Sequence, residues 1–158
     1  MKNFNVKEYI RESNLIESID DRKEDKQSLA AWNFLSEQDK LSKRTLRTLH
    51  ELITLNQMSD DESGTFRNEL RINVFIGGHM APPHYMVGGL IDNWLLDYAE
   101  GAEEPIIAHI KYEHIHCWAD GNGRTGRMLL WWHELKNGTK PTLFKASEKY
   151  EKYYTLFS

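Results

Sequence analysis

The residues from Arg124 to Leu135 constrain the fold of this chain more than any other stretch. They are apolar on most sides of a helix, through Met128, Leu129, Leu130, Trp131 and Trp132. A helix that is apolar all round is stable only when other elements surround it. We therefore predict a helical bundle in which this helix lies at the centre and ends at Asn137-Gly138.

Apolar periodicity predicts the other helices. The pattern is clearest from Tyr85 to Tyr98, where six apolar residues follow the spacing of one helix face. Pro105 opens a helix that runs from Ile106 to about His116. Further helices are expected at Asn5–Ile19, Gln27–Leu35, Leu41–Leu55 and Ser147–Phe157.

The segments between the helices are predicted to be short and mostly polar. Asp20 to Asp25 reads as a charged linker, Asn56 to Ser63 as a loop, and Pro141 to Lys145 as extended chain. Leu70 to Ile76 alternates and contains β-branched residues, which predicts a strand closed by Gly77-Gly78. The expected fold class is mostly α with one small β-hairpin.

Composition excludes several classes of protein. The 158 residues suffice for one domain with a single core. The net charge of −4 gives no basic surface for nucleic acid. One cysteine, Cys117, excludes an internal disulfide framework and fits a reducing compartment. Because the N-terminus lacks an apolar signal region and no stretch is long enough to span a membrane, we expect a cytoplasmic protein.

A glycine-rich turn precedes the central helix and carries the features of an anion site. Gly121 and Gly123 permit positive φ and let backbone amides converge on one small concavity. Arg124 and Arg127 would follow in the first turn of the helix, whose positive end also favours an anion. Two arginines there oppose the helix dipole, so a bound anion would explain them.

Two residues just before these arginines supply further chemistry. Asp120 is a hard oxygen ligand placed for Mg²⁺. His116, four residues earlier, is a base that works near neutral pH. A zinc pair of His114 and His116 is disfavoured, because residues two apart on a helix diverge by roughly 200°. His114 is expected to be a core histidine or a support for the site.

Two nucleotide-binding motifs overlap the same stretch and do not fit it. Gly121-x-Gly123-x-x-Gly126 satisfies the dinucleotide pattern, but that pattern requires a preceding strand, and a helix is predicted there instead. A phosphate loop of the Walker type needs Lys followed by Ser or Thr, whereas this chain has Arg127-Met128.

The whole string from His116 to Arg127 resembles the signature of the Fic family, His-x-Phe-x-Asp/Glu-Gly-Asn-Gly-Arg-x-x-Arg. Trp118 replaces the Phe, and Cys117 stands where Pro is common. We expect Trp118 to anchor the loop in the core, as the Phe does in the family, and Cys117 to be a packing residue.

The resemblance extends beyond this string. Gly64-Thr65-Phe66-Arg67 is similar to the Gly-x-aromatic-Arg turn of Fic proteins, and residues 77–83 are similar to their flap and the proline-rich run after it. The resemblance implies a Fic-type helical bundle with a small β-hairpin flap. Residues 1–158 would form one Fic domain, with an inhibitory helix at 1–20, the flap at 70–80 and the catalytic loop at 116–127.

The resemblance also implies a reaction, the transfer of AMP from ATP to a Tyr, Thr or Ser hydroxyl of a target protein. His116 would take the proton and Asp120 would hold Mg²⁺. The nucleotide-binding residues would be Asp120, Gly121, Asn122, Gly123, Arg124 and Arg127, with both arginines also counted as catalytic. The flap would dock the target through Ile76, Gly77, Gly78 and His79. A homo-oligomer is possible, and no nucleic-acid or membrane partner is expected.

A second resemblance lies in the N-terminal helix. Ser13-Asn14-Leu15-Ile16-Glu17-Ser18 is similar to the Fic inhibitory motif Ser/Thr-x-x-x-Glu-Gly/Asn, with Ser18 in place of Gly or Asn. Glu17 falls on the same helical face as Ser13, so we expect it to be directed inward and buried. The resemblance implies that its cationic partner is Arg127. Ser147-x-x-x-Glu151 is the alternative inhibitory pair.

Three other activities stay open at this point. Relatives of Doc toxins use a similar loop to transfer phosphate, and some Fic proteins remove AMP from their targets. The chain could also be a binding module whose loop only holds a nucleotide. The presence of both His116 and Asp120 argues against a module without catalysis.

Overall fold

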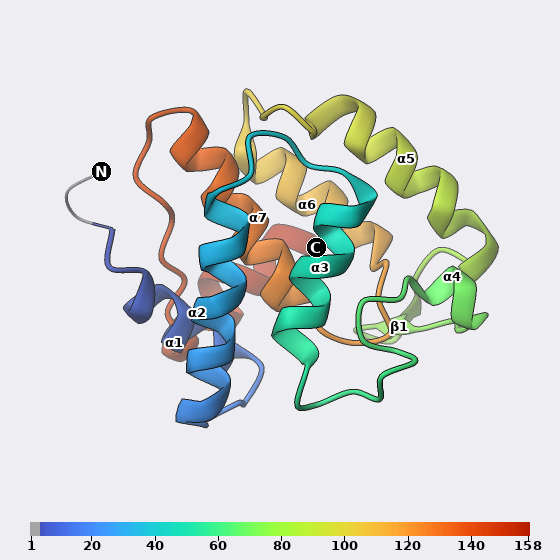
Figure 1. The fold of residues 1–158 in the computed structure, drawn as a ribbon, viewed down its shortest axis with the longest axis horizontal. Helices are drawn as coiled ribbons and strands as arrows, with labels where there is room; N and C mark the ends of the chain where they lie inside the picture. Colours follow the sequence, from blue (N-terminus) through green and yellow to red (C-terminus); the bar gives the residue numbers. More distant parts are fainter. Residues whose placement is uncertain (1–3) are drawn as a thin grey trace.

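The computed structural model describes residues 4–158 and has the central helix that the sequence predicts. Helix α7 (Asn122–Lys136) is buried along most of its length, and the bundle surrounds it (Figure 1). The helices packed against it are α1 (Val6–Ile16), α2 (Arg22–Ser36), α3 (Lys43–Thr54) and α6 (Pro105–Ile115). Helix α5 (Val87–Tyr98) follows the short turn η1 (His84–Met86) and covers α6. The mostly α fold is therefore confirmed.

The core explains why α7 is the organising element. Trp131 packs edge-on against three aromatic rings from the N-terminal part of the chain, those of Phe4, Tyr9 and Trp32. On another side of the core, Trp94 of α5 donates a hydrogen bond to the Ala108 carbonyl of α6 (2.9 Å). No helix among residues 4–158 combines the length and apolarity needed to cross a bilayer.

The N-terminal helices differ from their predicted bounds. α1 ends at Ile16 rather than Ile19, because Ser18 adopts φ 59° and turns the chain. The predicted linker Asp20–Asp25 is wrong from Arg22 onward. The Asp21 side chain accepts from the Lys23 amide (2.8 Å) and caps α2, so the charged residues form its first turn. Residues 1–3 of the predicted inhibitory segment lie outside the described chain.

The predicted strand Leu70–Ile76 is mostly wrong. Its first residue ends a short helix, α4 (Arg67–Leu70), after which Arg71 adopts φ 56°. Only β1 (Phe75–Ile76) is extended, pairing with β2 (His79–Met80) in antiparallel register. Gly77 and Gly78 both have positive φ, 52° and 86°, as a tight two-residue hairpin requires. The predicted hairpin is therefore present, but each of its strands is two residues long.

The C-terminal residues do not form the continuous helix predicted for Ser147–Phe157. The chain instead passes through a 3-10 turn η2 (Ala146–Glu148), a π turn η3 (Lys149–Tyr153) and a 3-10 turn η4 (Tyr154–Phe157). Within these turns Tyr153 is buried, and its hydroxyl meets Nε2 of buried His109 at 3.0 Å, which holds η3 against α6.

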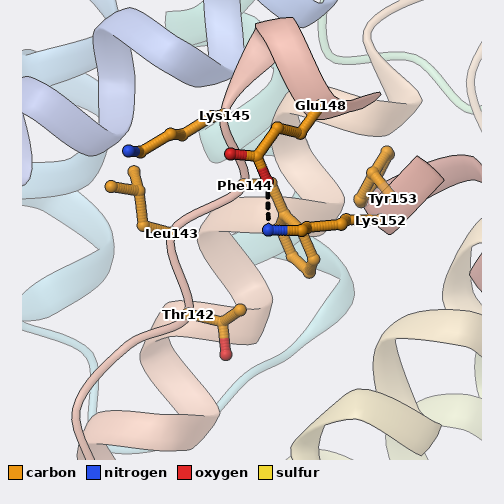
Figure 2. A pocket seen from close by; sticks show the side chains of 7 residues that line it. All are labelled: Thr142, Leu143, Phe144, Lys145, Glu148, Lys152 and Tyr153. Carbon is orange, nitrogen blue, oxygen red and sulfur yellow. Dashed lines mark ion pairs between the residues drawn. The ribbon is translucent and has the colours of Figure 1, made fainter. Parts of the chain in front are cut away.

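A small cavity of about 280 Å³ lies beside these turns. Figure 2 shows the side chains that line it, with an ion pair joining Glu148 and Lys152. The lining comes from residues 142–153 and includes no residue of the predicted catalytic loop. Tyr153 is the one side chain that it shares with the larger cavity described next.

Candidate active site

The predicted catalytic loop opens into a cavity of about 910 Å³. Four parts of the chain line it, namely the flap, the end of α6, the start of α7 and the C-terminal turns. From the predicted site, the lining includes His116, Gly123, Arg127, Ile76, Gly77 and His79. The structure thus brings the proposed base, an anion site and the flap to one cavity, which the sequence alone could not place together.

His116 is held in a fixed orientation at the end of α6. Its backbone is left-handed (φ 51°), so the chain turns sharply from the helix into the loop. Ring atom Nδ1 donates to the Glu113 carbonyl (3.0 Å), which leaves Nε2 as the basic nitrogen. Burial lowers the pKa of His116, so the ring is neutral at pH 7 and able to accept a proton.

The anion cradle is the first turn of α7. Gly121 has φ 84° and precedes the helix, and its carbonyl accepts from the Thr125 amide (3.1 Å). The amides before Thr125 therefore stand at the positive end of the helix, where they can bind an anion. The helix begins two residues earlier than predicted, which places Arg127 in its second turn rather than its first.

Asn122 has a different role from the one expected of its side chain. Its Oδ1 accepts from the Trp118 amide and its Nδ2 donates to the Trp118 carbonyl, both at 2.9 Å. The side chain is buried and closes the loop on itself. Only the backbone amide of Asn122 remains to face a phosphate.

A stack of three rings supports the loop on its buried side. Trp118 is fully buried, as predicted, and its ring is stacked between those of His50 and Phe66, with centroid separations of 4.0 and 4.3 Å. His50 Nδ1 accepts from the Gly64 amide (2.8 Å), so its Nε2 donates to the Asp120 carbonyl (2.8 Å). Burial lowers the pKa of His50 to about 4, which keeps this arrangement neutral. No sequence pattern indicated His50, because it lies in a helix 70 residues before Asp120.

The tryptophan at position 118 makes one bond that phenylalanine could not make. Its Nε1 donates to the Tyr112 hydroxyl (2.7 Å), which also meets Thr125 Oγ1 (2.8 Å). We expect Trp118→Phe to lower the free energy of unfolding by about 1–3 kcal/mol, because it leaves a cavity and removes a partner of a buried hydroxyl. Urea unfolding of Trp118→Phe, Tyr112→Phe and the double variant checks this. Strictly additive effects would contradict the bond's contribution.

Arg67 connects the flap to His116, the proposed base. Its side chain is fully buried and donates to the carbonyls of His116, Ile115, Ile72 and Pro82. Ile72 precedes the hairpin of the flap and Pro82 follows it. The sequence identified Arg67 as part of a turn but could not show this bridge between two sides of the cavity.

The two arginines of the loop have different partners. Arg124 is buried and donates to Gln57 Oε1 (2.6 Å), a residue of the loop after α3 that the sequence did not suggest. Arg127 donates from Nε to Ser13 Oγ (2.7 Å) and from one terminal nitrogen to the Ser13 carbonyl (3.0 Å). The same nitrogen forms an ion pair with Glu17 Oε1 (2.8 Å). The predicted pairing of Glu17 with Arg127 is therefore present.

The Glu17 carboxylate lies over the start of α7. A Cβ placed on Gly123 would come within 2.4 Å of Glu17 Oε1, so the carboxylate lies against the anion cradle. The expectation of a buried glutamate is wrong: the Glu17 side chain is 35% exposed, and Arg127, at 1%, is the buried partner. The reason is that α1 ends at Ile16, which leaves Glu17 to reach inward from the rim. The alternative glutamate, Glu151, is exposed, and within residues 4–158 it forms no ion pair with Arg127.

Asp120 can hold a metal only with help from other ligands. Its carboxylate is exposed, and its Oδ1 accepts from the Gly121 amide (2.8 Å). Within residues 4–158 there is no group of three or more His, Cys, Asp or Glu side chains that could bind an ion by themselves. One carboxylate completed by water and phosphate oxygens is a common way to bind Mg²⁺, so Asp120 fits that ion together with a nucleotide.

Two further residues are placed by the structure. Cys117 is fully buried and is a packing residue, as expected, and burial raises the pKa of its thiol far above its usual range. His114, expected to be a core histidine or a support for the site, is not in the core: it is exposed and lines the cavity. Gly78, predicted to dock a target, is in the flap turn, and its φ of 86° suits glycine.

Comparisons with known proteins agree with this geometry. The model of the Fic/DOC family matches residues 40–133. A protein adenylyltransferase Fic from Drosophila grimshawi is 31% identical over 121 residues, which cover 71% of this chain and 24% of the relative. The protein of the same name from Culex quinquefasciatus is 29% identical over 127 residues, covering 76% and 24%. The chain thus spans about a quarter of the length of these relatives.

Solved structures show the same fold. Fic-1 from C. elegans superposes with a TM-score of 0.78 at 22% identity, covering 99% of this chain and 56% of that one. A Fic family protein from Desulfovibrio desulfuricans G20 gives a TM-score of 0.68 at 25% identity, covering 84% and 48%. The N-terminal helix and the C-terminal turns, outside the family match, are included in the first superposition.

Proposed function

This chain belongs to the Fic/DOC family, and on that premise we propose that it transfers AMP from ATP to a Tyr, Thr or Ser hydroxyl of a target protein. The observation that carries the proposal is the placement of a neutral, oriented histidine beside an anion cradle in one cavity. Relatives named protein adenylyltransferase support the choice of reaction.

In the proposed reaction, His116 takes the proton from the incoming hydroxyl at Nε2. The hydroxyl oxygen forms a bond to the α-phosphorus of ATP, the bond from that phosphorus to the bridging oxygen breaks, and pyrophosphate leaves. The amides at the start of α7 hold phosphate oxygens, and Arg124 and Arg127 neutralise charge on the β- and γ-phosphates. Mg²⁺ bound to Asp120 would supply further positive charge to the phosphates. Positioning and charge stabilisation of this kind supply most of the catalysis in such transfers.

The flap is the proposed docking edge for the target. β2 is a short, exposed strand with no further strand beyond it in the described chain, so an extended segment can pair with it. Ile76, Gly77 and His79 line the cavity, so a side chain of that segment would enter near His116. Gly78 completes the turn.

The identity of the transferred group tests this proposal. We expect a protein hydroxyl to acquire label from ATP carrying the isotope at the α-phosphorus and none from ATP labelled at the γ-phosphorus. Mg²⁺ should be required, and a chelator should abolish labelling, because the Asp120 carboxylate is itself an anion and would act on the phosphates only through a bound cation. The assay uses the parent and Glu17→Gly proteins. It measures the isotope that each protein retains and the increase in its intact mass. Label only from the γ-position would show phosphate transfer, and ATP binding without any label would indicate a binding module.

A further inference from the structure

Glu113 is a buried carboxyl group to which neither the family signature nor the proposed reaction gives a role. It lies on α6, is 9% exposed and lines the large cavity together with Gly123 and Arg127. Its Oε1 atom has no hydrogen-bond partner among residues 4–158. Gly126 makes room for it, since a Cβ at that position would lie 2.0 Å from Oε1. The carboxyl group is therefore fitted closely against α7 beside the anion cradle.

The contacts of Arg127 indicate that this carboxyl group is neutral. The guanidinium directs its ion pair at Glu17 and its other hydrogen bonds at Ser13, and one of its nitrogens is unpartnered within the described chain. An ionised carboxylate buried without a donor is strongly unfavourable. Burial raises the pKa of Glu113 to about 8, with Arg127 opposing and Glu17 adding to the rise.

The remaining groups around Glu113 do not change this conclusion. The charged and titratable side chains that face it are Arg127 of α7, Glu17 after α1, Tyr112 of α6, Cys117 of the loop, and Tyr153 and Tyr154 of the C-terminal turns. Only Arg127 is a cation, and its hydrogen bonds and ion pair go to Ser13 and Glu17 rather than to Glu113. At pH 7 the carboxyl group thus keeps its proton, which makes it a hydrogen-bond donor.

We propose that Glu113 is a further nucleotide-binding residue that donates a hydrogen bond from its carboxyl group to a phosphate oxygen beside Arg127. The proposal rests on the proposed function, because it takes the phosphate in this cavity to be that of ATP. The geometry favours such an acceptor. Glu113 lines the same cavity as Arg127 and as Gly123, which lies at the positive end of α7. This part of the cavity favours an anion, so a neutral donor at Glu113 would donate to an anionic ligand. A buried acid held neutral so that it can donate is a known device in active sites.

ATP affinity in the Glu17→Gly protein tests this idea, since that variant removes the carboxylate lying over Gly123. Calorimetry at pH 7 compares three forms of position 113. Glu113→Gln keeps a donor and cannot ionise, and it should bind ATP as the Glu17→Gly reference does. Glu113→Met keeps a similar volume without a donor, and it should bind about tenfold more weakly or worse.

The pH dependence separates this role from a structural one. Between pH 7 and 9 the reference should lose ATP affinity, by up to about tenfold per pH unit, because ionised Glu113 loses its proton and repels phosphate. The Glu113→Gln protein should not show this loss. Because Glu17 raises the pKa of Glu113, its removal should place the midpoint below about 8.

Several results would overturn the proposal. Equal ATP affinities of the Gln and Met forms, or an unchanged pH dependence in the Gln form, would show that no donor is used. Affinity rising with pH would mark Glu113 as an ionised counter-ion of Arg127. Thermal unfolding shows whether each variant is folded, and if the Met form is not, the Gln form alone decides. If the Glu17→Gly reference binds no ATP, the proposed function is overturned as well. If the reference binds ATP and the substitutions at Glu113 leave that affinity unchanged, this inference alone is overturned.

Discussion

His116→Ala is expected to lower the rate of AMP transfer by about 10²–10⁴-fold, the usual cost of removing a general base. Nδ1 of His116 is occupied by the Glu113 carbonyl, so Nε2 is the atom available to the target hydroxyl. ATP binding should persist, because the cradle at the start of α7 and the two arginines do not depend on the imidazole. The rate is measured with α-labelled ATP and affinity by calorimetry.

The pH profile gives an independent check on this residue. His116 must be neutral to accept a proton, and burial places its pKa below the ordinary value of 6.5. Transfer should therefore stay constant as pH falls toward 6.5 and decline only as the pH passes through the lowered pKa. His114→Ala, which removes a second histidine that lines the cavity two residues before His116, is the matched control. Full activity in His116→Ala, or equal losses in both variants, would show that His116 is not the base.

The chemistry of the loop was predictable from sequence because its determinants are local. Gly121 needs positive φ, and Arg127 follows the turn at a fixed helical spacing, so residue type and spacing predict an anion site without knowledge of the rest of the fold. The central position of α7 was predictable for a similar reason, since a helix apolar on most sides must be surrounded.

The supports of the loop were not predictable, because they come from distant parts of the chain. Three polar residues contact the loop or its base from 70, 67 and 49 residues away in the sequence, namely His50, Gln57 and Arg67. Each is an ordinary polar residue in its own segment. Nothing in local periodicity marks such a contact. The C-terminal turns show the same limit, because the contact of Tyr153 with His109 joins residues 44 apart and leaves no mark on the local pattern.

Glu17→Gly is expected to raise transfer by about tenfold or more, both onto a target and onto the chain itself. The expected size follows from the charge-assisted bond to Arg127, since bonds of that kind contribute about 1.5–3 kcal/mol. We propose that Glu17 is an autoinhibitory residue, or brake: its carboxylate lies where it competes with a phosphate for Arg127 and for the cradle at Gly123. ATP would then bind in a pose whose α-phosphate is turned away from the hydroxyl. ATP affinity should change less than the rate.

Two variants separate a brake from a general disturbance of the site. Arg127→Ala should not raise transfer, because it removes the proposed phosphate contact together with the partner of Glu17. Glu151→Gly changes the alternative glutamate, which is exposed, and should leave the rate at the parent's level. Side-by-side labelling of the three variants and the parent with α-labelled ATP makes the comparison. Equal rates in the parent and Glu17→Gly would mean that Glu17 is no brake, and an increase in Glu151→Gly would transfer the role to that residue. If Glu17→Gly instead lost an ability to strip AMP from a modified target, Glu17 would be assigned to positioning water for hydrolysis.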